Sequence, residues 1–274
     1  MELSGQIAIV TGASRGIGRA YAIALAGAGA HVVVTARSEP DLSDVVKSIG
    51  QSGGAATAIV ADVTDRAAVD GLVARVEQQV GPIDILINNA GAGSALGRMA
   101  EVDPDEWWRE VEINLRGPHL YMRAVLPHMI RRHRGRIINI ASYAGLSAPQ
   151  NISAYSVSKT ALIRLTEIAA RETQPEGVTM FVIQPGDVHT QMWDNLMQRD
   201  AQRAPNMVQN FQKLEANDRW TPIEDSVALV LLLASGQADD LTGCFLSVDD
   251  DIPALIQQAD MIQKDGRRKL SFRE

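Results

Sequence analysis

Seven short apolar runs recur along the chain, and a longer amphipathic window separates each run from the next. The runs are residues 6–10, 31–36, 56–61, 84–90, 135–142, 178–185 and 244–248. Their apolar residues are continuous rather than alternating, which is typical of strands covered on both faces. The windows carry apolar residues at three-to-four spacing, which predicts helices. The alternation predicts an α/β fold: a single doubly wound domain with a seven-stranded parallel sheet and helices on both faces.

The rhythm of strands and helices breaks in two places. Residues 187–220 are rich in Met, Gln, Asn and Trp, and we expect them to form a substrate lid within a domain that spans 1–250. Residues 251–274 form a C-terminal extension that is helix-like at first and then basic and polar. Residues 103–132 are expected to form one long helix, with Pro118 as the residue that would bend it.

The composition argues against several functional classes. The chain of 274 residues has a net charge of −7, so neither nucleic acid nor an anionic membrane is expected as a partner. A single cysteine, Cys244, leaves no intramolecular disulfide and no cysteine-based metal cluster. The N-terminal residues lack the basic region of a signal peptide, and no apolar window reaches the length of a membrane helix. We therefore expect a cytoplasmic protein.

A glycine-rich loop follows the first predicted strand and opens a helix. Its sequence VTGASRGIG places Gly12, Gly16 and Gly18 so that the backbone can turn tightly and approach a pyrophosphate at the positive end of the helix. Ser14, Arg15 and Ile17 fill the loop between them. The spacing is G-x-x-x-G-x-G rather than the common dinucleotide fingerprint, so an ordinary turn is the alternative. The strand–turn–helix context favours phosphate binding.

The second predicted strand ends without the carboxylate that usually holds the adenosine ribose of NAD. Arg37 follows this strand instead, and Arg15 lies in the glycine loop. Two guanidinium groups suit the 2′-phosphate of NADP. We therefore favour NADP(H) as the cofactor and keep NAD(H) as the alternative, since both arginines are otherwise ordinary surface residues.

Several motifs in this order resemble the classical short-chain dehydrogenase/reductase family. They are T-G-x-x-x-G-x-G at 11–18, ADVTD at 61–65, NNAG at 88–91, Asn114, Ser142, the Y-x-x-x-K pair Tyr155 and Lys159, and PGDVHT at 185–190. The resemblance implies a Rossmann-type domain, a nicotinamide cofactor and hydride exchange between a small carbonyl compound and an alcohol. It also implies assembly as a homodimer or homotetramer.

The resemblance further assigns residues to the cofactor. Asp62 and Val63 would contact the adenine, and Asn89, Ala90 and Gly91 would line the cofactor and support the sheet. Pro185, Gly186, Val188 and Thr190 would hold the nicotinamide amide, and Tyr155 and Lys159 would contact its ribose. These residues also have simpler, structural interpretations. Asp62 is a candidate N-cap of the following helix, and asparagines are common in turns after a strand.

The catalytic assignment centres on Tyr155 and Lys159, which are neighbours on one helical face. A tyrosine has an ordinary pKa of about 10. A lysine cation beside it and the positive charge of an oxidised nicotinamide both favour the phenolate, which predicts a lowered pKa. Tyr155 would be the general acid/base, and Ser142 would donate to the substrate oxygen. The resemblance alone assigns Asn114 to a water relay toward Lys159. The five histidines lack metal-ligand spacing, so no metal site is expected.

The substrate is expected to be apolar. The segment that would line its pocket contains six large apolar residues: Met192, Trp193, Met197, Met207, Phe211 and Trp220. The alternative is that these residues form helix core or a subunit interface. Asp249, Asp250 and Asp251 are expected to be solvated rather than to bind a cation. An NADPH-dependent carbonyl reductase is therefore the first hypothesis; an NAD-dependent alcohol dehydrogenase and a non-catalytic cofactor sensor are its rivals.

Overall fold

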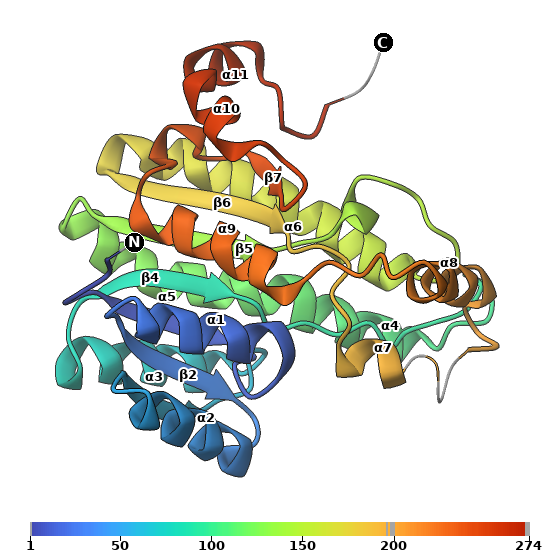
Figure 1. The fold of residues 1–274 in the computed structure, drawn as a ribbon, viewed down its shortest axis with the longest axis horizontal. Helices are drawn as coiled ribbons and strands as arrows, with labels where there is room; N and C mark the ends of the chain where they lie inside the picture. The colour runs from blue at the N-terminus through green and yellow to red at the C-terminus, as the bar shows by residue number, and fades with distance from the viewer. Residues whose placement is uncertain (1, 196, 198–200, 272–274) are drawn as a thin grey trace.

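A seven-stranded parallel sheet forms the centre of the protein, as the computed structural model shows for residues 2–195, 197 and 201–271, with the side chain of Met192 outside the description. The strands are β1 (Ile7–Thr11), β2 (His31–Ala36), β3 (Ala55–Val60), β4 (Ile83–Asn88), β5 (Gly135–Ile140), β6 (Val178–Gln184) and β7 (Phe245–Ser247). Their order is β3-β2-β1-β4-β5-β6-β7, and every neighbouring pair is parallel (Figure 1). The predicted fold class is confirmed.

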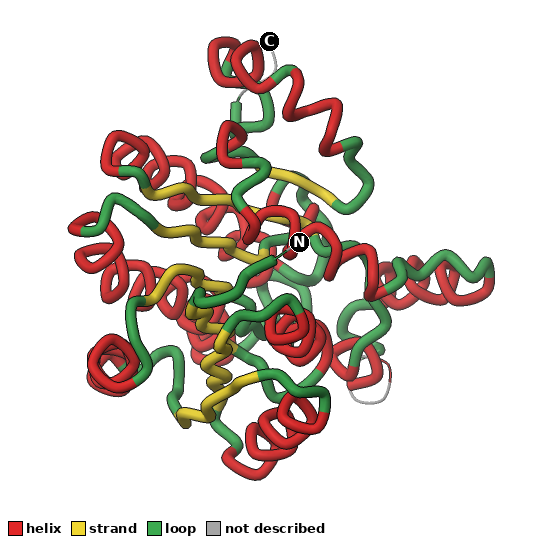
Figure 2. Tube along the Cα trace, turned by 60° about the vertical axis from the view of Figure 1, so that its left-hand side comes forward, coloured by secondary structure: helices red, strands yellow, loops and turns green. Residues whose placement is uncertain are grey.

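Helices cover both faces of the sheet, so its strands are buried on both sides (Figure 2). One face packs against α1 (Gly16–Gly27), α2 (Glu39–Gln51) and α9 (Ile223–Ser235). The other packs against α3 (Arg66–Gln79), α5 (Gly117–Arg131) and α6 (Ser153–Thr173). The remaining helices are α4 (Pro104–Val111), α7 (Gln191–Asn195), α8 (Pro205–Ala216), α10 (Ile252–Gln257) and α11 (Ala259–Asp265). None of the helices in these ranges combines the length and hydropathy that a bilayer span requires.

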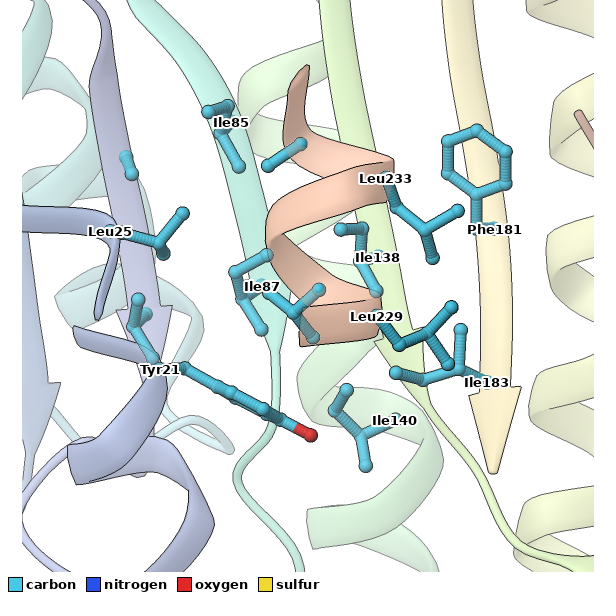
Figure 3. Packing of buried hydrophobic residues seen from close by; sticks show 14 of the residues in the cluster. Tyr21, Leu25, Ile85, Ile87, Ile138, Ile140, Phe181, Ile183, Leu229 and Leu233 are labelled. Atoms are coloured by element: carbon cyan, nitrogen blue, oxygen red, sulfur yellow. The ribbon is translucent and has the colours of Figure 1, made fainter. Parts of the chain in front are cut away.

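The first core lies between the sheet and helices α1 and α9. Figure 3 shows Tyr21 and Leu25 of α1 and Leu229 and Leu233 of α9 directed at the isoleucines of the central strands. The buried phenol of Tyr21 is satisfied by Ser226 of α9, with 2.6 Å between the two oxygens. Apolar burial on this scale is the main stabilising contribution to such a fold, and it fixes the strand ends from which the loops of the site project.

The predicted long helix over 103–132 is instead three consecutive pieces. Helix α4 ends at Val111, residues Glu112–Arg116 form a π-helical turn, and α5 begins at Gly117. Pro118 lies in the first turn of α5, where its missing N–H costs no hydrogen bond. The break is therefore the π turn rather than a proline bend, and the turn buries Asn114 completely.

The C-terminal extension returns to the edge of the sheet. After α11, the carbonyl oxygen of Arg268 accepts a hydrogen bond from the backbone N–H of Phe245 in β7. The Arg268 guanidinium pairs with Asp250, and Leu270 packs against a cluster that includes Phe245 and Ile163. The tail thus covers β7, a strand of three residues at one end of the sheet order.

The acidic run after β7 is more ordered than the sequence suggested. Asp250 accepts from the backbone N–H of Ser247 at 2.7 Å, Asp249 from the Ser247 hydroxyl at 3.1 Å, and Asp251 caps α10. The expectation of a solvated cluster holds for Asp249 and Asp251, which are exposed. It fails for Asp250, whose carboxylate is only 11% exposed and is paired with Arg268 of the tail. The described part of the chain contains no group of three or more candidate metal ligands.

Candidate functional site

The glycine loop lies between β1 and α1 and is held by Asn89, which follows β4. The Asn89 side-chain amide donates to the carbonyl oxygens of Thr11 at 3.0 Å and Gly12 at 3.3 Å. Gly12 has φ +63°, and a Cβ there would lie 2.8 Å from the Cα of Ala90. A Cβ at Gly18 would collide with the Asn89 amide. Asn89 therefore supports the loop, and two of the three predicted glycines are required by close approach.

Both predicted phosphate-binding arginines are exposed at this edge of the sheet. Arg37 directly follows β2, and its side chain forms no hydrogen bond or ion pair with any residue in the described part of the chain. Arg15 precedes α1, and its Nη1 donates to Oε1 of Gln191 at 2.8 Å. This bond joins the glycine loop to α7, the first helix of the predicted lid. Ser14, Gly16 and Ile17 belong to the same loop. A guanidinium with no protein partner has all its donors free for an anion.

Asp62 lies after β3 but does not cap the following helix. The N-cap of α3 is Asp65, so the alternative interpretation of Asp62 was wrong. Asp62 accepts from the backbone N–H and the hydroxyl of Thr64 and pairs with Arg109 at 3.0 Å. Desolvation raises the pKa of Asp62, but the Thr64 bonds and the Arg109 guanidinium outweigh it and hold that pKa below its usual range. Val63 beside it is buried against Gly117.

Asn114 lies at the centre of the π turn and uses its side chain to hold the loop after β4. Its Oδ1 accepts from the backbone N–H of Ala92 at 2.8 Å, and its Nδ2 donates to the Ala92 carbonyl at 2.9 Å and to the Ser158 hydroxyl at 3.1 Å. Both amide hydrogens are thus used within the protein. A Cβ at Gly91 would lie 3.3 Å from the Asn114 Oδ1 and 3.8 Å from the Lys159 Nζ.

Ser142, Tyr155 and Lys159 come together where β5 ends. Ser142 follows the strand, and its hydroxyl accepts from the backbone N–H of Ala144 at 3.1 Å. It also lies close enough to the Tyr155 phenol to lower the pKa of that group. Tyr155 and Lys159 lie in the first two turns of α6, with the Lys159 Nζ 5.4 Å from the centroid of the Tyr155 ring. The Lys159 Nζ also donates to the carbonyl oxygen of Ile140 at 2.8 Å.

The pKa values of this pair differ from the sequence expectation. Desolvation raises the pKa of Tyr155 to about 12, against the opposing effect of the Ser142 hydrogen bond. Desolvation likewise lowers the pKa of Lys159 to about 8, while the Glu110 carboxylate opposes that change. In the protein without cofactor, burial therefore outweighs any effect of Lys159 on the phenol pKa, because it disfavours both charged forms. A lowered pKa with the oxidised nicotinamide bound stays a prediction.

The segment after β6 faces the glycine loop. Pro185 is buried, and a Cβ at Gly186, which has φ +87°, would collide with Thr221. The backbone N–H of Asp187 donates to the Thr221 hydroxyl at 3.0 Å. Thr190 lies beside Gly16, with 3.9 Å between its Cγ2 and the position of a Cβ on that glycine. Val188 lies between these contacts and is partly buried.

A cluster of aromatic side chains packs against Tyr155. Trp193 is 4.3 Å from Phe211 and 5.6 Å from Trp220 between ring centroids, and Phe211 and Trp220 are stacked. Met197 and Met207 pack against the same cluster, together with Tyr155 itself. The predicted specificity residues thus meet at the catalytic edge, apart from Met192, whose side chain lies outside the described part of the structure.

Two carboxylates near this site were missed as candidate residues. Glu110 is buried beside the loop after β4, and Asp187 acts electrostatically on Tyr155. Asp187 lies inside the PGDVHT motif, but neither that motif nor its distance from other candidate residues in the sequence indicates a role for it. Nothing in the local sequence distinguishes Glu110 from the exposed glutamates of the same window, since its burial depends on residues 94–95.

Comparisons with known proteins agree with this geometry. The family model for short chain dehydrogenases matches residues 6–201. A short chain dehydrogenase of Pseudocercospora fijiensis is 40% identical over 193 residues, which cover 70% of this chain and 62% of that protein, less than two thirds of its length. The 3-oxoacyl-(acyl-carrier-protein) reductase of Salmonella typhimurium is 35% identical over 251 residues, which cover 91% of this chain and 98% of that protein.

Solved structures extend the likeness to three dimensions. A gluconate 5-dehydrogenase from Burkholderia cenocepacia, in complex with NADP and tartrate, is similar with a TM-score of 0.82 and 31% identity. The match covers 92% of this chain and 97% of that one. From the family match over more than half of its residues, this chain belongs to the short chain dehydrogenase family, whose members are oxidoreductases acting on CH–OH and C=O groups.

Proposed function

We propose that this chain is an NADPH-dependent oxidoreductase that interconverts a ketone or aldehyde and an alcohol by hydride transfer, with Tyr155 as general acid/base. The observation that carries the proposal is the meeting of Ser142, Tyr155 and Lys159 at the end of β5. The glycine loop lies at the same carboxyl edge of the sheet, which is where doubly wound folds bind dinucleotides.

The residues at this edge fit a nicotinamide dinucleotide. Gly12 and Gly18 have no room for a Cβ, and Arg37 and Arg15 offer exposed guanidinium groups at the positions expected for a 2′-phosphate. Three similar solved structures contain NADP, which supports NADP(H) over NAD(H). When bound, the nicotinamide would give or take the hydride. Asp62, Val63, Asn89, Ala90 and Gly91 would line the adenine and ribose side, and Pro185, Gly186, Val188 and Thr190 the amide side.

The protein's own residues would then control the proton. The raised pKa of Tyr155, about 12, keeps the phenol protonated at neutral pH, so it can donate to the oxygen of a carbonyl under reduction. The Ser142 hydroxyl would hold the same oxygen, and the Lys159 cation beside the ring would stabilise the phenolate that remains. Asn114 would act by fixing the loop at Ala92 rather than by offering its amide hydrogens to water.

An apolar substrate is supported by the cluster of Trp193, Phe211 and Trp220 packed above Tyr155. Such a surface excludes water from the reacting atoms and favours apolar groups. Residues 187–220 would act as the lid of a domain over 1–250, with 251–274 as an extension. The alternative is that these aromatic side chains are only the core of the segment. Competition between apolar and polar substrates distinguishes the two, because a substrate pocket of this kind prefers apolar compounds.

We also propose a cytoplasmic homodimer or homotetramer. The assembly is supported by a groove of about 690 Å³ beside α4, α5 and α6, whose lining includes the apolar side chains of Trp108, Leu115, Leu165 and Ile168. Trp108 is 62% exposed and Ile168 48% exposed, which is unusual for large apolar side chains on one surface. Light scattering of the purified protein would test the assembly, and a monomer would contradict it.

The deciding experiment is a panel of ketones and alcohols assayed with NADPH and NADP⁺ at the nicotinamide absorbance. We expect turnover of apolar ketones, with kcat/KM higher for NADPH than for NADH. A strong preference for NADH would favour the NAD-dependent alcohol dehydrogenase instead. Cofactor binding without turnover of any substrate would favour a sensor.

A further inference from the structure

Glu110 is a buried carboxylate beside the catalytic edge with no part in the steps described above. It lies in the last turn of α4 and is only 2% exposed. Its Oε2 accepts from the backbone N–H groups of Ser94 at 2.6 Å and Ala95 at 2.8 Å. Burying a carboxylate costs free energy unless hydrogen bonds and an opposite charge compensate for the lost hydration. The groups that compensate Glu110 therefore show which part of the protein it serves.

Glu110 and Asn114 hold neighbouring residues of one loop. Asn114 fixes Ala92 through both ends of its side-chain amide, and Glu110 fixes the next turn of chain at Ser94 and Ala95. This loop follows the β4 segment that contacts the glycine loop, and Leu96 just beyond it packs in the cluster with Tyr155 and Trp193. The two side chains therefore connect this loop, which forms one wall of the site, to α4 and to the π turn that follows α4.

The Glu110 carboxylate interacts electrostatically with both members of the Tyr155–Lys159 pair. Desolvation raises the pKa of Glu110, while its two backbone hydrogen bonds and the Lys159 cation lower it, and Glu106 on the same helix raises it. In return, the Glu110 charge raises the pKa of Lys159 and of Tyr155. Asp187, after β6, also raises the Tyr155 pKa, and it faces Asp249.

We infer that Glu110 is a positioning residue of the hydride-transfer site: it anchors residues 94–95, and its buried negative charge acts on the Tyr155–Lys159 pair. This inference rests on the proposed function for its kinetic consequence. It does not require Glu110 to touch substrate or cofactor, because both effects pass through other residues.

The charge is tested with Glu110→Gln, which keeps an oxygen acceptor but removes the negative charge. We expect the pH at which the alcohol-oxidation rate rises to move down by about half a unit or more, because loss of an anion lowers the pKa of Tyr155 and Lys159. Glu112→Gln is the matched control, since Glu112 is 42% exposed and lies two residues away. An unmoved profile in Glu110→Gln, like that of the control, would overturn the electrostatic role.

The anchoring is tested with Glu110→Asp, which keeps the charge but shortens the side chain by one methylene. We expect a pH profile like that of the unaltered protein and a substrate KM raised by about tenfold, the size of one hydrogen bond to a charged group. An unchanged KM in Glu110→Asp would overturn the anchoring role, whether or not Glu110→Gln folds.

A direct titration separates this inference from the proposed function. Phenolate absorbance of the cofactor-free protein, with Tyr155→Phe as the blank, reports the ionisation of Tyr155 without any turnover. Glu110→Gln should ionise at lower pH than the unaltered protein, and identical titrations would contradict the inference. Full activity of Tyr155→Phe would instead defeat the proposed function and leave the titration result standing.

Discussion

The Nζ of Lys159 lies 5.4 Å from the centroid of the Tyr155 ring and donates a hydrogen bond to the carbonyl oxygen of Ile140. The lysine is therefore held by the end of β5 as well as by its own helix. The position of the ammonium group over the ring therefore depends on α6 and on the end of β5, since Ile140 lies 19 residues before Lys159 in the sequence.

Tyr155→Phe removes the hydroxyl that would transfer the proton. We expect kcat to fall by about a thousandfold, within the usual range for loss of a general acid, while the Kd for the cofactor stays nearly the same. Steady-state kinetics and cofactor fluorescence titration measure the two quantities. Tyr143→Phe is the control, because it removes the same hydroxyl from an exposed tyrosine that directly follows Ser142. Comparable activity of the two variants would rule out the acid/base role.

Lys159 should make the stability of the fold depend on pH. Unfolded, its pKa is the ordinary 10.5, whereas burial lowers the folded pKa to about 8. Between these values the unfolded chain binds more protons, so the free energy of unfolding should rise with pH from about 8 to 10.5. Relative to Lys159→Met, the gain should be on the order of 2–3 kcal/mol. Denaturant unfolding of both proteins across this range measures it, and parallel curves would contradict the lowered pKa.

Arg37→Asp should reverse the cofactor preference. A carboxylate there repels a 2′-phosphate and accepts hydrogen bonds from a ribose diol. We expect kcat/KM with NADPH to fall by about a hundredfold and that with NADH to hold or rise. Arg75→Asp makes the same charge change on the exposed surface of α3, where Gln79 is the one hydrogen-bond partner of Arg75 among the described residues. If both variants lost activity equally with the two cofactors, the assignment of Arg37 would fail.

Arg268→Ala should loosen the tail from the sheet edge. The substitution leaves the Asp250 carboxylate, only 11% exposed, without its cation. We expect the free energy of unfolding to fall by about 1–3 kcal/mol. The neighbouring Arg267→Ala breaks an exposed pair with Asp265 and should cost at most about 0.5 kcal/mol. Equal losses in the two variants would show that the tail contact contributes nothing specific.

Much of the fold is encoded locally. Each predicted strand lies within about two residues of the observed one, because a strand covered on both faces must be continuously apolar over its whole length. The glycine loop and the i,i+4 spacing of Tyr155 and Lys159 are local as well. The predicted single helix over 103–132 failed because a π turn has no sequence pattern distinct from that of an α-helix, and here it accompanies the burial of Asn114.

The sequence by itself determined the sheet, the glycine loop and the identity of the groups that end on one edge of that sheet. Only the tertiary structure decided what surrounds each group. The Tyr155 pKa rises rather than falls, Asp250 serves the tail rather than the solvent, and Glu110 is buried against residues 94–95. Desolvation and hydrogen bonding depend on atoms brought together by folding, so the charge state of a side chain is a property of its neighbours rather than of its spacing.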